Sequence, residues 1–156
     1  MKTSTRRFLT HWVPVIGWML LIFAGSSDVL SAEHTSRFLV PFLRWLDPQI
    51  SIAAIAQINL VLRKLGHLTE YAVLAALLWR ALRATLRSTS TVSIAAITVA
   101  VSGLFAASDE FHQSFVATRT ASETDIFIDV CGAVIGVAMC LVFARRNRKS
   151  RIENRK

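Results

Sequence analysis

The chain has 156 residues, enough for one domain, and combines 53% apolar residues with a formal net charge of +8 at pH 7. A chain this basic can bind nucleic acid along a charged groove, but here the Lys and Arg residues form short blocks at the ends of apolar runs. We therefore exclude nucleic acid as a partner and predict a single membrane domain over residues 1–156.

Four apolar runs indicate membrane-spanning helices. Each has roughly the length that a helix needs to cross a ~30 Å hydrocarbon core. No run shows the alternation of a membrane barrel, and only helices or barrels satisfy their backbone there. The sequence thus predicts an all-α fold, a bundle of four transmembrane helices. The expected spans are residues 12–27, 65–82, 91–108 and 125–143.

The first run has an alternative interpretation. It follows a basic N-terminal segment and ends in Ala24, Gly25 and Ser26, a pattern that also fits a signal peptide with a cleavage site. The bulky Trp12 and Trp18 and the three later runs favour a retained span. Cleavage would change the N-terminus and leave the rest of the topology as expected.

The link between the first two spans is too long for a tight turn and too apolar for a free loop. Within it, residues 35–62 mix apolar and cationic side chains, as a segment at a membrane surface does. We expect an amphipathic helix on the outer leaflet, with a re-entrant hairpin as the alternative. Residues 50–62 have a helical pattern that can run directly into the second span.

The basic residues predict the orientation in the membrane, because Lys and Arg are enriched in cytoplasmic segments. They concentrate in the N-terminal segment, in the link between the second and third spans, and in the tail at 144–156. With four spans, these three segments share one side. We therefore expect a bacterial inner-membrane protein with both termini in the cytoplasm.

The polar residues within the spans gather at the opposite, outer side. On each of three helices they have helical spacing and so share a face. These residues are Lys64, His67 and Tyr71 on the second span, Asp109, His112 and Gln113 at the end of the third, and Asp125 and Asp129 on the fourth. Their common depth predicts a site in the outer third of the bundle.

Asp129 is the clearest sign of a function, because it lies one turn inside a span. A carboxylate at the centre of a membrane costs about 2.5–3.5 kcal/mol on insertion scales, so it faces a cavity or a partner. Gly132 and Gly136 continue its face and allow another helix to approach closely. We expect them to press Asp125 and Asp129 against the second or third span.

Each of these residues also has a simpler interpretation. Asp109 and Glu110 can end a helix in water, and a single His67 near the interface commonly only donates a structural hydrogen bond. Taken together, acids, imidazoles and an amide at helical spacing on converging helices favour a functional site over a soluble loop.

The sequence resembles the VanZ-like family over about Trp12 to Phe143. The resemblance rests on Ser26-Ser27, on Lys64-Leu-Gly-His67-Leu-Thr-Glu70-Tyr71, on Asp109-Glu110-x-x-Gln113-x-Phe115-x-x-x-Arg119-x-x-Ser122-x-x-Asp125, and on Gly132-x-x-x-Gly136. One position departs from the family pattern, which usually has Asn where this chain has Asp129. The resemblance implies a small multi-span fold. It also implies a role in antibiotic resistance, because the family is named for a protein that raises resistance to the glycopeptide teicoplanin.

Two functional hypotheses follow. In the first, the protein is an enzyme that acts on an envelope lipid or a lipid-linked cell-wall precursor at the outer leaflet. The catalytic candidates are Asp109, Glu110, His67 and Gln113, and the substrate-binding candidates are Lys64, Tyr71, His112, Arg119, Ser122, Asp125 and Asp129. Glu110 or Asp109 would be the general base, or both would join His67 and His112 around a divalent cation. Lys64 and Arg119 would hold an anionic head group.

In the second hypothesis, the same residues form an ion-pair network that fixes helix packing, or that binds a lipid or a glycopeptide without chemistry. No motif for a metal or a nucleotide is present, so the sequence names no cofactor. A channel is a weaker version, because below Asp129 the spans are almost entirely apolar. The sequence does not separate enzyme from binder.

Overall fold

The computed structural model describes residues 2–26, 32–115 and 123–153, and these residues are helical apart from short turns. The helices are α1 (Lys2–Gly25), α2 (Ala32–Leu46), α3 (Ile52–Thr85), α4 (Thr91–Gln113) and α5 (Glu123–Glu153). The described residues contain no strand. The expected all-α fold is therefore confirmed.

Short polar residues set the helix starts. Ser51 and Ser90 precede α3 and α4, and each serine hydroxyl accepts a hydrogen bond from a first-turn backbone N–H. Between α2 and α3, the Asp47 carboxylate accepts the Gln49 backbone N–H at 3.0 Å, a turn that Pro48 also favours. These caps fix where α3 and α4 begin, and hence the register of the residues that they carry.

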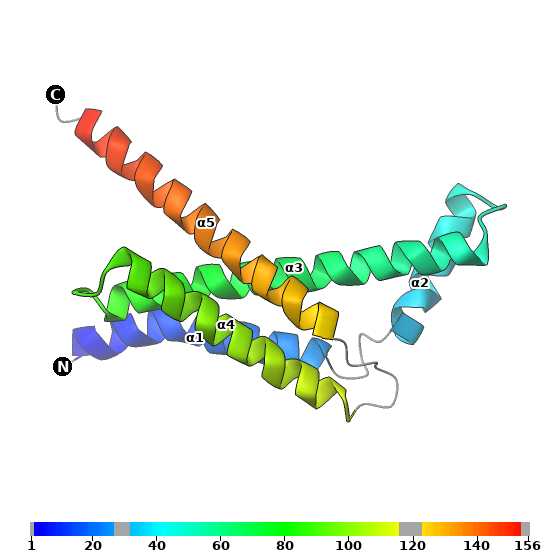
Figure 1. Cartoon of the computed structure of the whole chain (residues 1–156), viewed down its shortest axis with the longest axis horizontal. Coiled ribbons are helices and arrows are strands. Elements are labelled where there is room, and N and C mark those ends of the chain that lie inside the picture. The colour runs from blue at the N-terminus through cyan, green and yellow to red at the C-terminus, as the bar shows by residue number, and fades with distance from the viewer. Residues whose placement is uncertain (1, 27–31, 116–122, 154–156) are drawn as a thin grey trace.

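The central helix is α3, which contacts α1, α2, α4 and α5 (Figure 1). α1 and α4 run opposite to α3, whereas α5 crosses α3 while running the same way (Figure 1). As a result the C-terminal ends of α1 and α4 and the N-terminal end of α5 lie together beside the middle of α3. The first turns of α1 and the last turns of α5 lie toward the other end of the molecule.

Two apolar clusters hold the bundle together. One joins α1 to α3 and α4 through Val15, Ile22, Leu74 and Ala106, and the other joins α3, α4 and α5 through residues such as Ala133. Outside these clusters, large apolar side chains cover the outer surface of the bundle, for example Leu20, Leu104 and Phe127. A soluble monomer rarely exposes so much apolar surface, and a membrane would cover it.

Three helices in the described residues, rather than the expected four, are long and apolar enough to cross a membrane. They are α1 (Thr5–Gly25), α4 (Thr91–Gln113) and α5 (Thr124–Asn147). The exception is α3, which contains the expected span 65–82. It carries Arg63, Lys64, Glu70 and Arg80 along its length, and as the central helix it places many side chains against other helices instead of lipid.

The expected spans are shorter than the helices that contain them. The expected span 12–27 lies mostly in α1, which starts earlier and ends at Gly25, and Ser27 lies outside the described residues. Helix α4 continues past residue 108 to Gln113, and α5 extends beyond 125–143 at both ends. The helical pattern of 50–62 does run into the second span, since α3 is continuous from Ile52.

The segment 35–62 forms α2 and the first part of α3, which lie side by side and extend beyond the rest of the bundle (Figure 1). Asn59 Nδ2 donates to Ser36 Oγ at 2.9 Å between the two helices. On α2, Phe38 and Trp45 are 78% and 76% exposed. The segment is helical, whereas its place on the outer leaflet, with the re-entrant hairpin as the alternative, stays a prediction.

Candidate functional site

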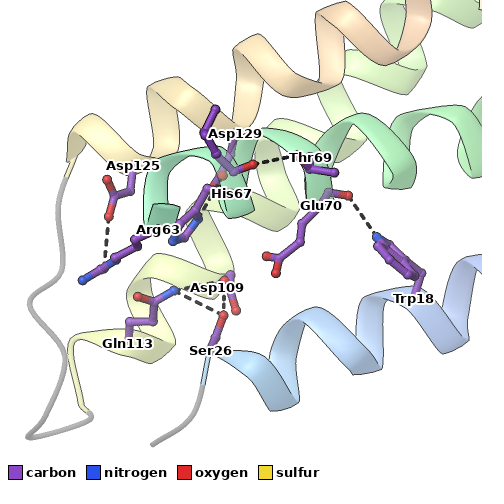
Figure 2. A network of polar contacts seen from close by, with 11 residues as sticks. Trp18, Ser26, Arg63, His67, Thr69, Glu70, Asp109, Gln113, Asp125 and Asp129 are labelled. Carbon is purple, nitrogen blue, oxygen red and sulfur yellow. Dashed lines mark hydrogen bonds and ion pairs between the residues drawn. The ribbon is translucent and has the colours of Figure 1, made fainter. Parts of the chain in front are cut away.

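Polar side chains gather where the ends of α1, α4 and α5 meet the middle of α3 (Figure 2). Four helices contribute to this region: α1 and α4 end there, α5 begins there, and α3 passes through it. Five acids of this region are buried or half-buried, and the adjoining part of α3 carries Arg63, which pairs with Asp125, and Lys64. The acids are Glu70, Asp109, Glu110, Asp125 and Asp129.

The α3–α5 seam is the set of contacts that Arg63, His67, Asp125, Asp129, Gly132 and Gly136 make between those two helices. Arg63 Nη2 donates to Asp125 Oδ2 at 3.1 Å, and His67 Nδ1 lies 3.1 Å from Asp129 Oδ1. Arg63 and His67 are four residues apart on α3, as Asp125 and Asp129 are on α5. The second pair therefore lies about one helical turn beyond the first. The seam thus matches cationic or imidazole groups on α3 with carboxylates on α5.

Glycines explain why the helices of the seam come so close. A Cβ at Gly132 would collide with the backbone carbonyl of Leu68, and one at Gly136 would collide with that of Ala72. Only glycine leaves room for backbone on backbone at these two positions, as in small-xxx-small helix packing. The expectation that the glycines press Asp125 and Asp129 against a neighbouring helix is confirmed, and that neighbour is α3.

The α1–α4 cluster consists of Ser26, Asp109 and Gln113. The Ser26 hydroxyl donates to Asp109 Oδ2 at 2.6 Å, and Gln113 Nε2 donates at 3.2 Å to both Ser26 Oγ and Asp109 Oδ2. All three side chains are buried. Asp109 Oδ1 and Gln113 Oε1 are also buried, and neither has a hydrogen-bond partner in the part of the chain that the structure describes.

Three other expected site residues, Tyr71, Glu110 and Lys64, lie on α3 and α4. Tyr71 is fully buried, with its ring centroid 6.2 Å from that of Phe105, and its hydroxyl has no partner among the described residues. Glu110 is buried at 5% exposure, next to the cluster in sequence. Lys64 is half-buried. Trp18 Nε1 donates to the Glu70 backbone carbonyl at 2.9 Å and fixes α1 against α3.

The structure brings most, but not all, of the expected site residues together. His67 and Tyr71 face the bundle, as do Asp109, Gln113, Asp125 and Asp129. His112 does not join Asp109 and Gln113, because its ring stacks on Phe23 of α1 with centroids 4.2 Å apart. Arg119 and Ser122 lie outside the described residues.

The suggested metal site finds no support among these side chains. No group of three or more His, Cys, Asp or Glu residues in the described part of the chain is arranged to hold a metal ion. The imidazole of His67 instead contacts Asp129, and that of His112 packs on an aromatic ring.

Sequence reasoning missed two members of the site. Arg63 precedes His67 by four residues, as Asp125 precedes Asp129, so the matched spacing could have paired it with Asp125. Ser26 belongs to the family-like pattern, but its contact with Asp109 can be seen only once the end of α1 is known to lie beside α4. Neither appears among the expected catalytic or binding residues.

The comparisons with known proteins agree with the resemblance seen in the sequence. The family model described as VanZ/LLP1 matches residues 11–144, which include every helix of the bundle except the outer ends of α1 and α5. Neither the curated proteins nor the solved structures gave a match to this chain.

Proposed function

The chain belongs to the VanZ/LLP1 family, and from this premise we propose that it is a bacterial inner-membrane protein whose site engages the head group of an envelope lipid or lipid-linked cell-wall precursor. The observation that carries the proposal is the one-sided burial of polar groups. Eight polar or charged side chains at one end of the bundle are buried among α1, α3, α4 and α5, and they are Ser26, His67, Asp109, Glu110, Gln113, Asp125, Asp129 and Tyr71.

In the proposed topology α3 is a fourth span, and both termini are cytoplasmic. Its segment 65–82 lies within the bundle beside three helices of spanning length, so it crosses the same layer. The basic residues of the N-terminal segment, the α3–α4 link and the last turns of α5 support this orientation, because such residues favour the cytoplasm. The polar site then faces outward.

The opposite half of the bundle supports a one-sided site rather than a conduit. There the buried residues are mainly apolar, such as Leu78, Leu82, Ile94 and Val137. The buried Thr98 hydroxyl is used within its own helix, donating to the Ile94 carbonyl at 2.7 Å. A ligand that enters from the outer leaflet would therefore stop at the polar end.

As an enzyme, the protein would use His67 as its general base. Asp129 holds one ring nitrogen, which leaves the other for the substrate, as a carboxylate orients histidine in hydrolases. Glu110 is the second acid–base candidate, because it is a buried carboxyl group near the C-terminal end of α4, at the same end of the bundle. Arg63 and Lys64 would hold a phosphate of the head group.

A non-catalytic function is the second candidate, and one observation favours it. The pairs Arg63–Asp125 and His67–Asp129 each join two helices, so they can fix packing without any ligand. In that case the protein binds an envelope lipid or a glycopeptide without changing it, or the network only sets the helix register.

A lipid comparison in cells separates these candidates. Envelope lipids and lipid-linked precursors would be profiled by mass spectrometry in cells that make equal amounts of wild type, Glu110→Gln, His67→Gln and Asp47→Asn. Asp47 is exposed in the α2–α3 turn and serves as the control. We expect a species that changes with wild type and Asp47→Asn but not with Glu110→Gln or His67→Gln.

Identical profiles for all four proteins, at equal abundance, would contradict catalysis and favour the binding or packing role. The same strains would be tested for susceptibility to teicoplanin, since the proposed ligand class includes the precursors that glycopeptides bind. We expect the wild type to lower susceptibility and the two site variants to lose that effect.

A further inference from the structure

The α1–α4 cluster has its hydrogen bonds distributed unevenly. The Ser26 hydroxyl and the Gln113 amide both direct their donors to Asp109 Oδ2, at 2.6 and 3.2 Å. The oxygens left over, Asp109 Oδ1 and Gln113 Oε1, are both acceptors, and both are buried without a partner among the described residues. Asp109 is 2% exposed and Gln113 is fully buried. Among the described residues, the cluster therefore lacks a donor for these two oxygens.

The missing donor should also be positively charged. A buried acceptor without a partner is unfavourable, and a buried carboxylate without a cation is more so. Neither Ser26 nor Gln113 carries a charge, and Arg63, the arginine drawn in Figure 2, already pairs with Asp125 through Nη2. Helices α1 and α4 both end at this cluster, and the C-terminal end of a helix favours a cation.

The geometry favours an ammonium group over a metal ion. No group of three or more His, Cys, Asp or Glu side chains in the described residues could hold a metal ion, and the cluster itself contributes a single carboxylate. A primary ammonium has three N–H donors and suits a few separate acceptors. Tyr71 adds a third unpartnered buried oxygen on α3, where its ring packs near Phe105, one turn before Asp109.

A second feature points to a phosphate close to the amine. Arg63 Nε is buried and has no partner among the described residues, so it is a cationic donor at the same end of the bundle (Figure 2). Helix α5 begins beside it, and the N-terminal end of a helix favours an anion. The Arg63 donor would suit the phosphate of a zwitterionic ligand, and the acceptors Asp109 Oδ1 and Gln113 Oε1 would suit its ammonium group.

We infer that the α1–α4 cluster is a subsite for the primary ammonium of a phosphoethanolamine-type lipid head group, whose phosphate lies toward Arg63. This inference rests on the proposed function and names the ligand class of the same site. Among the outer-leaflet ligands considered above, it selects amine-bearing phospholipids over lipids that lack an N–H donor.

The test uses the purified full chain in lipid nanodiscs. Retained lipid would be measured by native mass spectrometry after mixing phosphatidylethanolamine with its mono-, di- and trimethylated forms, and separately with phosphatidylglycerol. Each methyl group removes one N–H donor and leaves the charge in place. We expect about a tenfold preference for the unmethylated over the trimethylated lipid, the size of one charge-assisted hydrogen bond. Phosphatidylglycerol should be retained no better than the trimethylated lipid.

Substitutions in the α1–α4 cluster test whether it causes the preference for the unmethylated lipid. Asp109→Asn removes the charge and keeps an acceptor for Ser26, and we expect it to lose the preference. Gln113→Met removes both Oε1 and the Nε2 donor at similar volume, and because the Asp109 charge stays it should reduce the preference less. Asp47→Asn carries the same substitution on an exposed residue and should bind like the wild type.

Several outcomes would overturn the inference. Equal retention of the methylated series by the wild type would do so whether or not any variant folds. An unchanged preference in Asp109→Asn would place the amine elsewhere. If free phosphoethanolamine competes away the lipid at equal concentration, the ligand is a soluble amine rather than a lipid. A wild-type-specific change of the cellular lipid profile together with equal retention would leave the proposed function standing and reject only this subsite.

Discussion

The α3–α5 seam and the α1–α4 cluster lie at the same end of the bundle, yet they differ in how completely their carboxylates are paired. In the seam, each carboxylate contacts a cationic or imidazole partner on the facing helix at 3.1 Å. In the cluster, one carboxylate receives two neutral donors on one oxygen, while its other oxygen has no partner among the described residues. Both carboxylates of the seam are paired, whereas the carboxylate of the cluster is paired through only one of its oxygens.

This difference predicts different responses of the two regions when a carboxylate is replaced. Removing one partner from a buried pair leaves an uncompensated group and destabilises the fold. Removing the charge from a partly paired carboxylate relieves a cost that the ligand-free protein already carries, as functional sites often do. The two regions should therefore respond to substitution with opposite signs.

The largest effect is expected where the seam brings two backbones together. Replacing Gly132 and Gly136 together by Ala places each new Cβ against a carbonyl of α3, so the helices must move apart. We expect a loss of about 4 kcal/mol in unfolding free energy, since overpacking costs about 1–3 kcal/mol at each position. Tryptophan fluorescence during denaturation in detergent would measure it.

Gly66→Ala is the matched control, because a Cβ at this position of α3 meets nothing within 4 Å. There the change should be neutral or should stabilise the helix by about 0.5–1 kcal/mol. Equal stability of the double variant and this control would mean that α3 and α5 do not pack through their glycines.

A smaller loss is expected at the His67–Asp129 pair. Asp129→Leu leaves His67 buried without its partner and should cost about 3 kcal/mol. Asp129→Asn, the residue usual in the family pattern, keeps an oxygen for His67 and should cost about 1 kcal/mol or less. Comparing the two in the same denaturation assay separates the hydrogen bond from the charge.

If Asp129→Asn proved as damaging as Asp129→Leu, the pair would depend on ionisation rather than on the hydrogen bond. If neither variant lost stability, the seam would not be the structural element described above, and Asp129 would have to be assigned to the ligand.

Helical spacing predicted the seam well. Asp125, Asp129, Gly132 and Gly136 form one face of α5, and this face needs a close partner whatever the rest of the fold is. The sequence left open whether that partner was the second or the third span. Helix spacing defines faces, but the choice between neighbours depends on packing across the whole bundle, where α3 is central.

The cluster was less predictable. Asp109 and Gln113 share a face of α4, but the same spacing included His112, whose ring turns to Phe23 instead. Ser26 follows the end of α1, and no local pattern specifies which helix end it will meet. The unpartnered oxygens were beyond sequence reasoning, because they depend on side-chain orientation rather than on spacing.

Replacing Asp109 in the cluster should have the opposite effect on stability to the replacements in the seam. Asp109→Asn in a neutral detergent without amine-bearing lipid should raise the unfolding free energy by about 1 kcal/mol, because it removes a buried charge that no described cation neutralises. The Asn side chain keeps a carbonyl oxygen for the Ser26 hydroxyl, so the contact between α1 and α4 survives. Denaturation of both proteins, with and without added phosphatidylethanolamine, measures the difference.

With that lipid present the order should reverse, since only the wild type gains stability from a ligand that binds the folded state. A destabilised Asp109→Asn in both conditions would show that the carboxylate is already neutralised within the fold, and the cluster would then be as fully paired as the seam. Stabilisation of both proteins by the lipid to the same extent would show that the amine binds away from Asp109. Only the reversal in order is consistent with a partly paired cluster that a cationic head group completes.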